Sequence, residues 1–239
     1  MKILGIDYGT KRIGVAISIE KVEMPVKTIT VDNYKEKIKE IVNTKNIDTV
    51  VVGLPVSMSG RYNEITMKVV SFAIKIFKLV NKPVWLFDER LSTESSKYTA
   101  TTGKSYAENK DSLSALNILR RFNPESANAS KIVDSFPEWI PEWDKLPEEK
   151  MLMYQPDNPE IIYSVDKEIK ETKVFVSDPQ IFFLLKRKGY TPLNIIEDIC
   201  PDEYSSIVMN KENKKKCPDF LMNEKNVYTY KICARSSMD

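Results

Sequence analysis

The sequence predicts a mixed α/β domain in its first half, followed by a small α+β extension. Three observations lead to this fold class. Two β-rich segments at the start are joined by a short glycine-containing loop, as in a β-hairpin. Amphipathic helical patterns then alternate with short apolar runs, an order typical of parallel crossover strands. The composition changes after Phe122, where prolines become frequent. We therefore expect a five-stranded mixed sheet flanked by helices, which ends near this residue.

The N-terminal hairpin and a third strand form the first part of the predicted sheet. Residues 2–7 (KILGID) are apolar and end on an acid, and residues 12–18 (RIGVAIS) form a second β-rich run. The Gly-Thr pair between them supplies a short turn. Residues 26–30 predict a third strand, which we place at the edge of the sheet.

Helical patterns and buried strands alternate after this hairpin. Residues 34–44 and 64–80 carry apolar side chains at helical spacing. Residues 49–54 (TVVVGL) and 83–87 (PVWLF) are short apolar runs, typical of strands that are buried on both faces. A last helix is predicted over residues 109–122, where leucines recur at helical spacing. This order predicts an antiparallel hairpin edge followed by parallel strands.

The second half of the chain differs in amino-acid composition, because prolines are frequent at its start. Residues 123–160 contain six of the 13 prolines, and this density favours a linker or a segment that wraps around the domain. Residues 161–165 and 173–176 predict strands, and residues 179–187 predict a short helix. Residues 211–216 (KENKKK) indicate an exposed, charge-rich loop.

We therefore divide the chain into a domain over 1–122, a proline-rich segment over 123–160 and a C-terminal extension of unknown function over 161–239. Residues 1–122 carry 20 Lys and Arg against 13 Asp and Glu, whereas residues 123–239 carry 16 against 21. A basic domain suits a polyanionic partner. The acidic second half could then occupy the binding surface and act as a regulator.

Composition narrows the possible chemistry. The chain contains no histidine, which excludes Ser-His-Asp and Cys-His catalysis and any histidine-bound metal. The three cysteines, Cys200, Cys217 and Cys233, form no CxxC pair, so neither a disulfide framework nor a zinc site is indicated. The start lacks a signal-peptide pattern, and no apolar run approaches the ~20 residues of a membrane span. We expect a cytoplasmic protein with no membrane partner.

Three acids stand where strands and helices begin or end. Asp7 ends the first predicted strand, Glu89 follows the last predicted strand, and Asp111 lies near the start of the last helix. Because carboxyl ends of parallel strands meet at one edge, these acids could share that edge. Carboxylates that hold two divalent cations are one solution to phosphodiester hydrolysis. Each acid also has a simpler interpretation. Asp7 could form a turn, Glu89 could belong to a surface ion pair, and Asp111 could cap its helix.

Four motifs in a fixed order carry a family resemblance. They are residues 6–18 (IDYGTKRIGVAIS), 51–60 (VVGLPVSMSG), 88–93 (DERLST) and 110–119 (KDSLSALNIL). Together they resemble the YqgF/RuvX family of RuvC-like nucleases, over about residues 1–122. The resemblance implies an RNase H-like fold and a phosphodiesterase-type hydrolase that processes the 5′ end of pre-16S rRNA. The family was also proposed to resolve Holliday junctions.

The resemblance also implies a site. Asp7, Glu89 and Asp111 match the acidic positions of the family, so they are the expected catalytic residues and the ligands of Mg²⁺ or Mn²⁺. The expected substrate-binding residues are Lys11, Arg12, Gly53, Pro55, Gly60, Arg90, Ser92 and Thr93. The implied partners are nucleic acid, with pre-rRNA ahead of DNA junctions, and ribosomal particles.

Two departures from the family pattern concern substrate binding. Residues 94–110 form a shorter and less basic segment than is usual in the family. Residues 56–60 (VSMSG) replace the family's usual Asn-Met-Asp-Gly motif. These changes keep two alternatives open, a non-catalytic RNA-binding or ribosome-assembly factor and a Holliday junction resolvase-like DNA nuclease. An ATP-binding protein of the actin type is disfavoured, because the chain has only seven glycines and no second Asp-Gly phosphate motif.

The predicted strand order raises one geometric question. The strand over residues 50–54 should lie between the strands that carry Asp7 and Glu89. Two strand spacings amount to about 9.5 Å. Only a long Glu side chain and a bent strand end could bring the two acids together.

Overall fold

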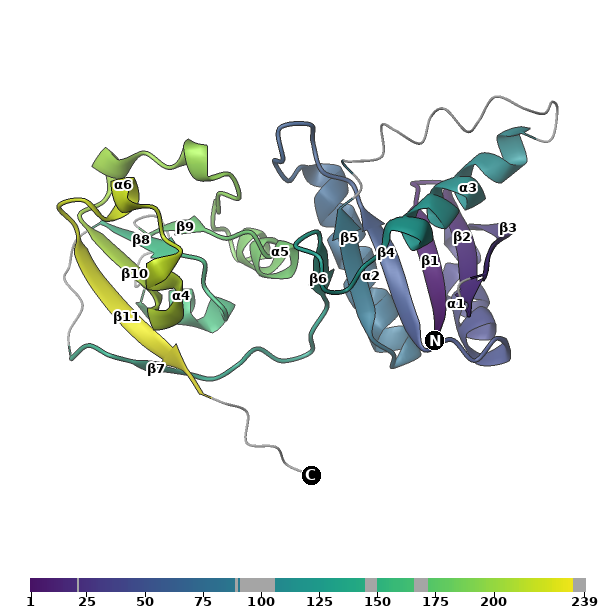
Figure 1. Cartoon of the computed structure of the whole chain (residues 1–239), viewed down its shortest axis with the longest axis horizontal. Coiled ribbons are helices and arrows are strands. Elements are labelled where there is room, and N and C mark those ends of the chain that lie inside the picture. Colours follow the sequence, from purple (N-terminus) through teal and green to yellow (C-terminus); the bar gives the residue numbers. More distant parts are fainter. Residues whose placement is uncertain (21, 89, 91–105, 145–149, 166–171, 234–239) are drawn as a thin grey trace. The chain divides into compact units, whose positions relative to one another are not determined.

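The computed structural model describes residues 1–20, 22–88, 90, 106–144, 150–165 and 172–233. The chain divides into two compact units, residues 1–132 and residues 133–239. Each unit has its own sheet (Figure 1). Among the described residues, no helix combines the length and the apolar character needed to cross a membrane.

The first unit is built on a six-stranded mixed sheet in the order β3-β2-β1-β4-β5-β6. The first three strands pair antiparallel, β4 and β5 continue parallel to β1, and β6 closes the far edge antiparallel to β5. The strands are β1 (Lys2–Tyr8), β2 (Arg12–Ile19), β3 (Val22–Thr30), β4 (Thr49–Leu54), β5 (Val84–Asp88) and β6 (Ala129–Lys131). The mixed α/β fold class is confirmed, and a sixth strand extends the expected five.

Three helices cover the two faces of this sheet (Figure 1). Helix α3 (Tyr106–Arg121) lies across β1, β2 and β3 on one face. On the other face, α2 (Glu64–Val80) packs on β4 and β5, and α1 (Tyr34–Thr44) packs against α2. All six residues of β4 are buried, as expected for a strand with helices on both sides.

Side chains of β1 alternate between the two faces of the sheet, and the residue that faces α3 at the closest approach is a glycine. Leu4 and Ile6 are fully buried, while Gly5 faces α3. A Cβ atom at Gly5 would lie 2.6 Å from Cγ of Leu119 and 2.9 Å from the main-chain oxygen of Ala115. The missing side chain therefore lets the helix backbone approach the strand.

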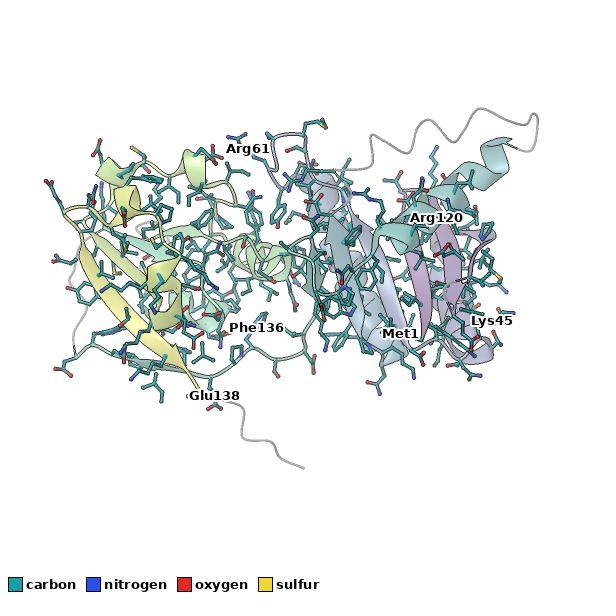
Figure 2. The ribbon with its side chains drawn as sticks, viewed as in Figure 1. Met1, Lys45, Arg61, Arg120, Phe136 and Glu138 are labelled. Atoms are coloured by element: carbon teal, nitrogen blue, oxygen red, sulfur yellow. The ribbon has the colours of Figure 1, made fainter. Side chains whose placement is uncertain are left out.

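A buried serine and a surface ion pair attach α3 to the edge strand β3. The Ser112 hydroxyl donates to the Val26 main-chain oxygen at 2.6 Å and lies 3.2 Å from the Thr28 hydroxyl. Near the C-terminal end of the helix, Arg120, labelled in Figure 2, lies 3.7 Å from the Glu23 carboxylate. The helix is therefore attached to β3 at its middle and near its C-terminal end.

The loop between β4 and α2 is tied to the start of the helix. Asn63 caps α2 by accepting hydrogen bonds from the main-chain N–H groups of Ile65 and Thr66 at 2.9 and 3.0 Å. The Thr66 hydroxyl also donates to the Pro55 main-chain oxygen at 2.6 Å. The cap thus holds the loop that follows β4.

The second unit has a five-stranded sheet in the order β7-β11-β10-β8-β9, in which only β7 is antiparallel. Its core consists of apolar and aromatic side chains such as Leu152, Ile207 and Leu221, all fully buried. The strands are β7 (Trp139–Pro141), β8 (Met151–Tyr154), β9 (Lys173–Phe175), β10 (Ser206–Asn210) and β11 (Asn226–Ile232), and the helices are α4 (Pro159–Val165), α5 (Pro179–Arg187) and α6 (Asp219–Met222).

One predicted element in this half is wrong. Residues 161–165 form the end of helix α4 and not a strand. The turn begins at Asn158, whose side chain accepts from the Glu160 main-chain N–H at 2.8 Å, and Pro159 stands at the first helical position. Five residues are too few to distinguish a buried helix from a strand by periodicity.

The described residues of the proline-rich range 123–160 include three strands. Strand β6 belongs to the first sheet, whereas β7 and β8 belong to the second. Pro141 ends the short edge strand β7, and β8 contains no proline, so neither strand loses an internal hydrogen bond. The range that we expected to be a linker or a wrapping segment therefore contributes strands to both sheets.

Candidate active site

Asp7 is the residue before the last of β1 and lies opposite Gly14 of β2 in the antiparallel register. Residues directly opposite each other in such a pair project from the same face of the sheet. The position of Gly14 against α3 therefore places the Asp7 side chain on the face that α3 covers.

The main chain of Asp111 lies directly against Gly14. A Cβ atom at Gly14 would stand only 1.9 Å from the Asp111 main-chain oxygen, so no side chain fits there. Helix α3 thus brings Asp111 beside the strand pair that carries Asp7. Two of the three predicted acids are brought together by this contact.

The surroundings of Asp7 shift the pKa of its carboxyl group. Burial raises the pKa of Asp7 above its ordinary value, and the nearby charge of Asp111 raises it further. A hydrogen bond from Ser114, one helical turn after Asp111, acts in the opposite direction and lowers the pKa. Asp7 is therefore a partly desolvated carboxylate with one hydrogen-bond donor and one neighbouring acid.

This arrangement fits a hard divalent cation. The negative charge of Asp111 close to the partly buried Asp7 carboxylate favours a positive charge between the two residues, and carboxylate oxygen is the ligand that Mg²⁺ and Mn²⁺ prefer. Within the described part of the chain, no group of three metal-ligating side chains occurs. Glu89, the third expected acid, lies outside the described residues, as do Ser92 and Thr93.

The order of the parallel strands is as expected, with β4 between β1 and β5. Asp88 ends β5 at the same sheet edge, opposite Leu54 of β4. Its carboxylate accepts from Arg90 three times: from the main-chain N–H at 3.0 Å, from Nε at 2.8 Å and from Nη2 at 2.7 Å. In the described part of the chain, the partner of Arg90 is thus Asp88, one residue before the acid predicted to be catalytic.

The cations of the hairpin lie at this edge too. Lys11 and Arg12 are exposed at the turn into β2. The turn is closed by the Gly9 main-chain N–H, which donates to the Arg12 main-chain oxygen at 3.0 Å. Both residues therefore lie in the turn region that follows β1.

The predicted loop residues have mainly architectural contacts. Gly53 is a buried residue of β4, and Pro55 accepts the hydrogen bond from Thr66. Gly60 has a φ of +85° and donates its main-chain N–H to the Ser57 oxygen at 2.8 Å, which closes a turn. This left-handed conformation favours glycine over other residues.

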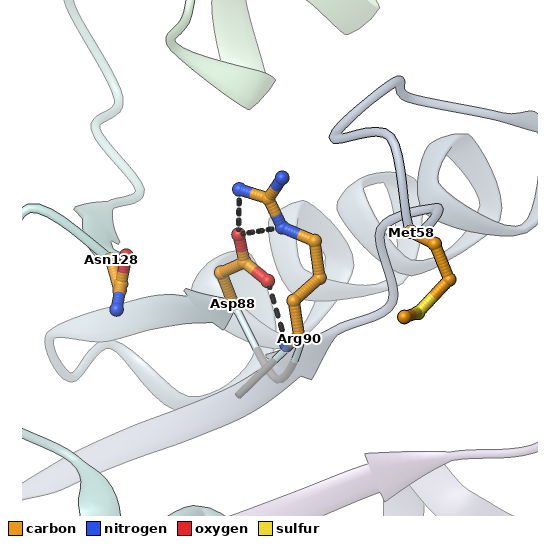
Figure 3. Close-up of a pocket in the computed structure, with 4 residues that line it drawn as sticks. All are labelled: Met58, Asp88, Arg90 and Asn128. Atoms are coloured by element: carbon orange, nitrogen blue, oxygen red, sulfur yellow. Dashed lines mark hydrogen bonds and ion pairs between the residues drawn. The ribbon is translucent and has the colours of Figure 1, made fainter. Parts of the chain in front are cut away.

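Four residues around the site were not predicted from the sequence. Ser114 could have been found, because it lies three positions after Asp111 and therefore on the same helix face. Asp88 directly precedes Glu89, the acid that matches the family's active-site position. Met58 and Asn128 gave no signal as ligand-binding residues, since their placement depends on the loop after β4 and on the pairing of β6. Figure 3 shows both beside Asp88 and Arg90.

Comparison with known proteins identifies the family of the first unit. The model of the RuvX family, described as Holliday junction resolvase, matches residues 1–122. A protein of Rickettsia africae named "Putative pre-16S rRNA nuclease" is 36% identical over 126 residues, which are 49% of this chain and 82% of that protein. A protein of Rickettsia typhi with the same name is 36% identical over 137 residues, 51% of this chain and 88% of that protein.

Solved structures resemble the chain only distantly. RuvC of T. thermophilus in complex with a Holliday junction substrate has a TM-score of 0.39 at 14% identity, covering 55% of this chain and 99% of that one. YeaZ from Pseudomonas aeruginosa has a TM-score of 0.27 at 12% identity, covering 40% and 52%. The family assignment therefore depends on the sequence match, which spans just over half of the chain. By that match, the chain belongs to the RuvX family.

Proposed function

We propose that the first unit is a metal-dependent nuclease that cleaves structured RNA, with the 5′ end of pre-16S rRNA as its substrate. The observation that carries this proposal is the Asp7–Asp111 pair on the sheet face beneath α3. The names of the Rickettsia relatives support the choice of substrate. Ribosomal particles are the proposed context for binding.

Each acid has a defined task in this proposal. Asp7 and Asp111 hold a divalent cation on the α3 face, Glu89 completes the ligand set, and Ser114 orients the Asp7 carboxylate through its hydrogen bond. A bound Mg²⁺ or Mn²⁺ supplies charge stabilisation for the attacked phosphodiester and lowers the pKa of a water molecule. The chain's own carboxylates accept protons poorly while a cation is bound, so their main work is positioning.

The cations near the pair suit a phosphate backbone. Lys11 and Arg12 are exposed beside the end of β1, and Arg90 is exposed at the end of β5. Lysine and arginine contacts to phosphates position nucleic acid without reading its sequence. Binding through them should weaken as salt rises.

The test is cleavage of a pre-16S RNA with its 5′ leader by the full chain, in Mg²⁺ or Mn²⁺. Asp7→Asn and Asp111→Asn should each lower the cleavage rate by about 10²-fold or more, because several kcal/mol of charge stabilisation are lost. Glu36→Gln removes an exposed acid of α1, which packs against α2 on the face opposite α3, and serves as the control. Equal rates for wild type and Asp7→Asn would contradict the assignment. RNA binding without any cleavage would favour a non-catalytic assembly factor.

A second candidate substrate follows from the family description, which names Holliday junction resolution. The same preparation should therefore be incubated with a four-way DNA junction at matched metal and salt. Faster cleavage of the junction than of the pre-16S RNA would make the chain a DNA nuclease. The roles of Asp7 and Asp111 would be unchanged, because both reactions hydrolyse a phosphodiester.

A further inference from the structure

A pocket of about 360 Å³ opens at the carboxyl ends of β4 and β5 (Figure 3). Its described lining consists of Met58, Asp88, Arg90 and Asn128. These residues come from three separate segments: the loop after β4, the end of β5 and the turn before β6. The volume lies in the range of small-molecule sites in proteins, which is about 300–1,000 Å³.

We propose that this pocket binds one unpaired nucleotide, with adenine as the preferred base. The proposal depends on the proposed function only for its placement, because a nuclease site at the same sheet edge would present the nucleotide next to the phosphodiester that is cleaved. The base would lie between Met58 and Asn128, and its phosphate would meet Arg90. Each contact follows from the local geometry.

Arg90 is the anchor for the phosphate. Two of its N–H groups are directed at the Asp88 carboxylate, from Nε at 2.8 Å and from Nη2 at 2.7 Å. A guanidinium has five N–H donors, so three remain for another anion. The side chain is still 39% exposed, so a phosphate can reach it, and Asp88 fixes its direction before the nucleotide arrives.

Met58 provides an apolar wall. Met58 is 89% exposed, so its thioether is accessible to a ligand. The turn that carries it is well defined, since Gly60 donates to the Ser57 oxygen at 2.8 Å and Ser57 donates to the Arg61 oxygen at 3.2 Å. A flexible thioether on a fixed turn can adapt to the flat face of a base.

Asn128 supplies recognition of the base edge. Its main-chain oxygen accepts from the Asp88 N–H at 3.0 Å, which holds the residue beside the Asp88–Arg90 pair. Its side chain is exposed, and in the described part of the chain no hydrogen bond to its amide is found. An amide offers one donor and one acceptor side by side, the pattern that pairs with N6 and N7 of adenine.

Asn128 lies outside the part of the chain that the family model matches, which is residues 1–122. It is held against β5 by the pairing of β6 that follows it. Figure 3 shows Asn128 and Met58 on opposite sides of the Asp88–Arg90 pair. The carboxylate and guanidinium between them make a purely apolar ligand unsuitable, whereas a nucleotide carries both an apolar face and an anion.

The test measures binding of the full chain to an RNA hairpin with one unpaired residue at the duplex end. Fluorescence anisotropy in Ca²⁺ limits cleavage during the measurement. Wild type should bind the adenosine hairpin about tenfold more tightly than the same hairpin with an abasic residue. In Met58→Ala and Asn128→Ala this ratio should fall toward one. Met24→Ala and Asn43→Ala remove exposed side chains elsewhere in the unit and should keep the wild-type ratio.

A specificity change gives the sharper outcome. In Asn128→Asp the side chain only accepts hydrogen bonds, so preference should move from adenosine toward cytidine, whose amino group donates. Equal binding of adenosine and abasic hairpins by wild type, or an unchanged ratio in both alanine variants, would overturn the proposal. Asp7→Asn should keep the ratio. If wild type binds the adenosine hairpin more tightly than the abasic hairpin but does not cleave RNA, the nuclease assignment fails and the nucleotide pocket stands.

Discussion

Ser114 contacts the candidate active site through one hydrogen bond to Asp7. Groups that orient a metal ligand typically contribute 10- to 100-fold to metal affinity or activity. We expect Ser114→Ala to weaken Mn²⁺ binding and slow RNA cleavage by about that factor, while Ser114→Thr, which keeps a hydroxyl, restores much of both. Metal titration and cleavage rates check this, with Ser71→Ala on α2 as the control. An unchanged Mn²⁺ affinity in Ser114→Ala would remove the orienting role.

Glu142 in the second unit ties β11 to the segment after β7. Its carboxylate lies 2.6 Å from Lys231 Nζ and accepts from the Thr229 hydroxyl at 2.7 Å. These bonds, that of Lys231 first, lower the pKa of Glu142 from 4.5 to about 2. A lowered pKa in the folded state stabilises the fold above the unfolded value and loses that effect as pH falls.

The pH dependence of thermal unfolding tests this cluster. Wild type should unfold at a higher temperature than Glu142→Gln above pH 4.5, and the difference should vanish as pH falls toward about 2. Glu138→Gln, which removes an exposed carboxylate from the neighbouring segment, controls for the loss of one charge. A difference that stays constant over this range would show that Glu142 contributes by packing and not by its charge.

At the scale of elements, the contact between α3 and β2 decides where Asp111 lies. Gly14→Ala places a methyl group on the Asp111 main chain, which must move. We expect a loss of about 3 kcal/mol in the free energy of unfolding, the upper part of the range for overpacking, together with loss of cleavage. Urea denaturation and cleavage assays measure the two effects.

Gly189 offers a matched contrast for that substitution. Its φ is +94°, and no atom lies within 4 Å of a Cβ built there. Gly189→Ala should therefore cost only backbone strain, roughly 1 kcal/mol, and leave cleavage unchanged. If the two alanine variants were equally stable, close packing of α3 on Gly14 would not be the reason for a glycine at that position.

At the scale of the whole molecule, the boundary between the units predicts a minimal active fragment. Ile132 is buried, and its main-chain N–H donates to the Val84 oxygen at 2.8 Å, so the first unit needs β6 and this residue. We propose that residues 1–132 fold alone, and that residues 1–122 unfold at a lower temperature because the β5 edge is then uncovered. Circular dichroism melting of the two fragments decides between the boundaries.

The same fragment tests regulation by the second unit. Residues 133–239 carry an excess of acidic side chains, so their removal should raise RNA affinity several-fold at low salt, with the gain shrinking as salt increases. Weaker or unchanged binding by a folded 1–132 fragment would show that the second unit does not compete with RNA.

Prediction from the sequence succeeded where a pattern was long. Helices α1 and α2, of 11 and 17 residues, show several turns of periodicity, and their predicted bounds are the observed ones. The prediction was wrong at residues 161–165, where the apolar run was too short to show a period. It also missed β6, since three residues pair with β5 only because the chain returns to that edge.

The sequence by itself determined which chemistry is available and which family the chain belongs to. The absence of histidine leaves carboxylates, lysine, tyrosine, hydroxyls and thiols as catalytic groups, and the order of the four motifs pointed to the carboxylates of Asp7, Glu89 and Asp111. Only the tertiary structure decided that Asp111 lies against Gly14 beside Asp7, and that Asn128 meets Asp88 and Arg90. Both contacts join residues far apart along the chain, and their approach depends on strand pairing and helix packing that local patterns do not encode.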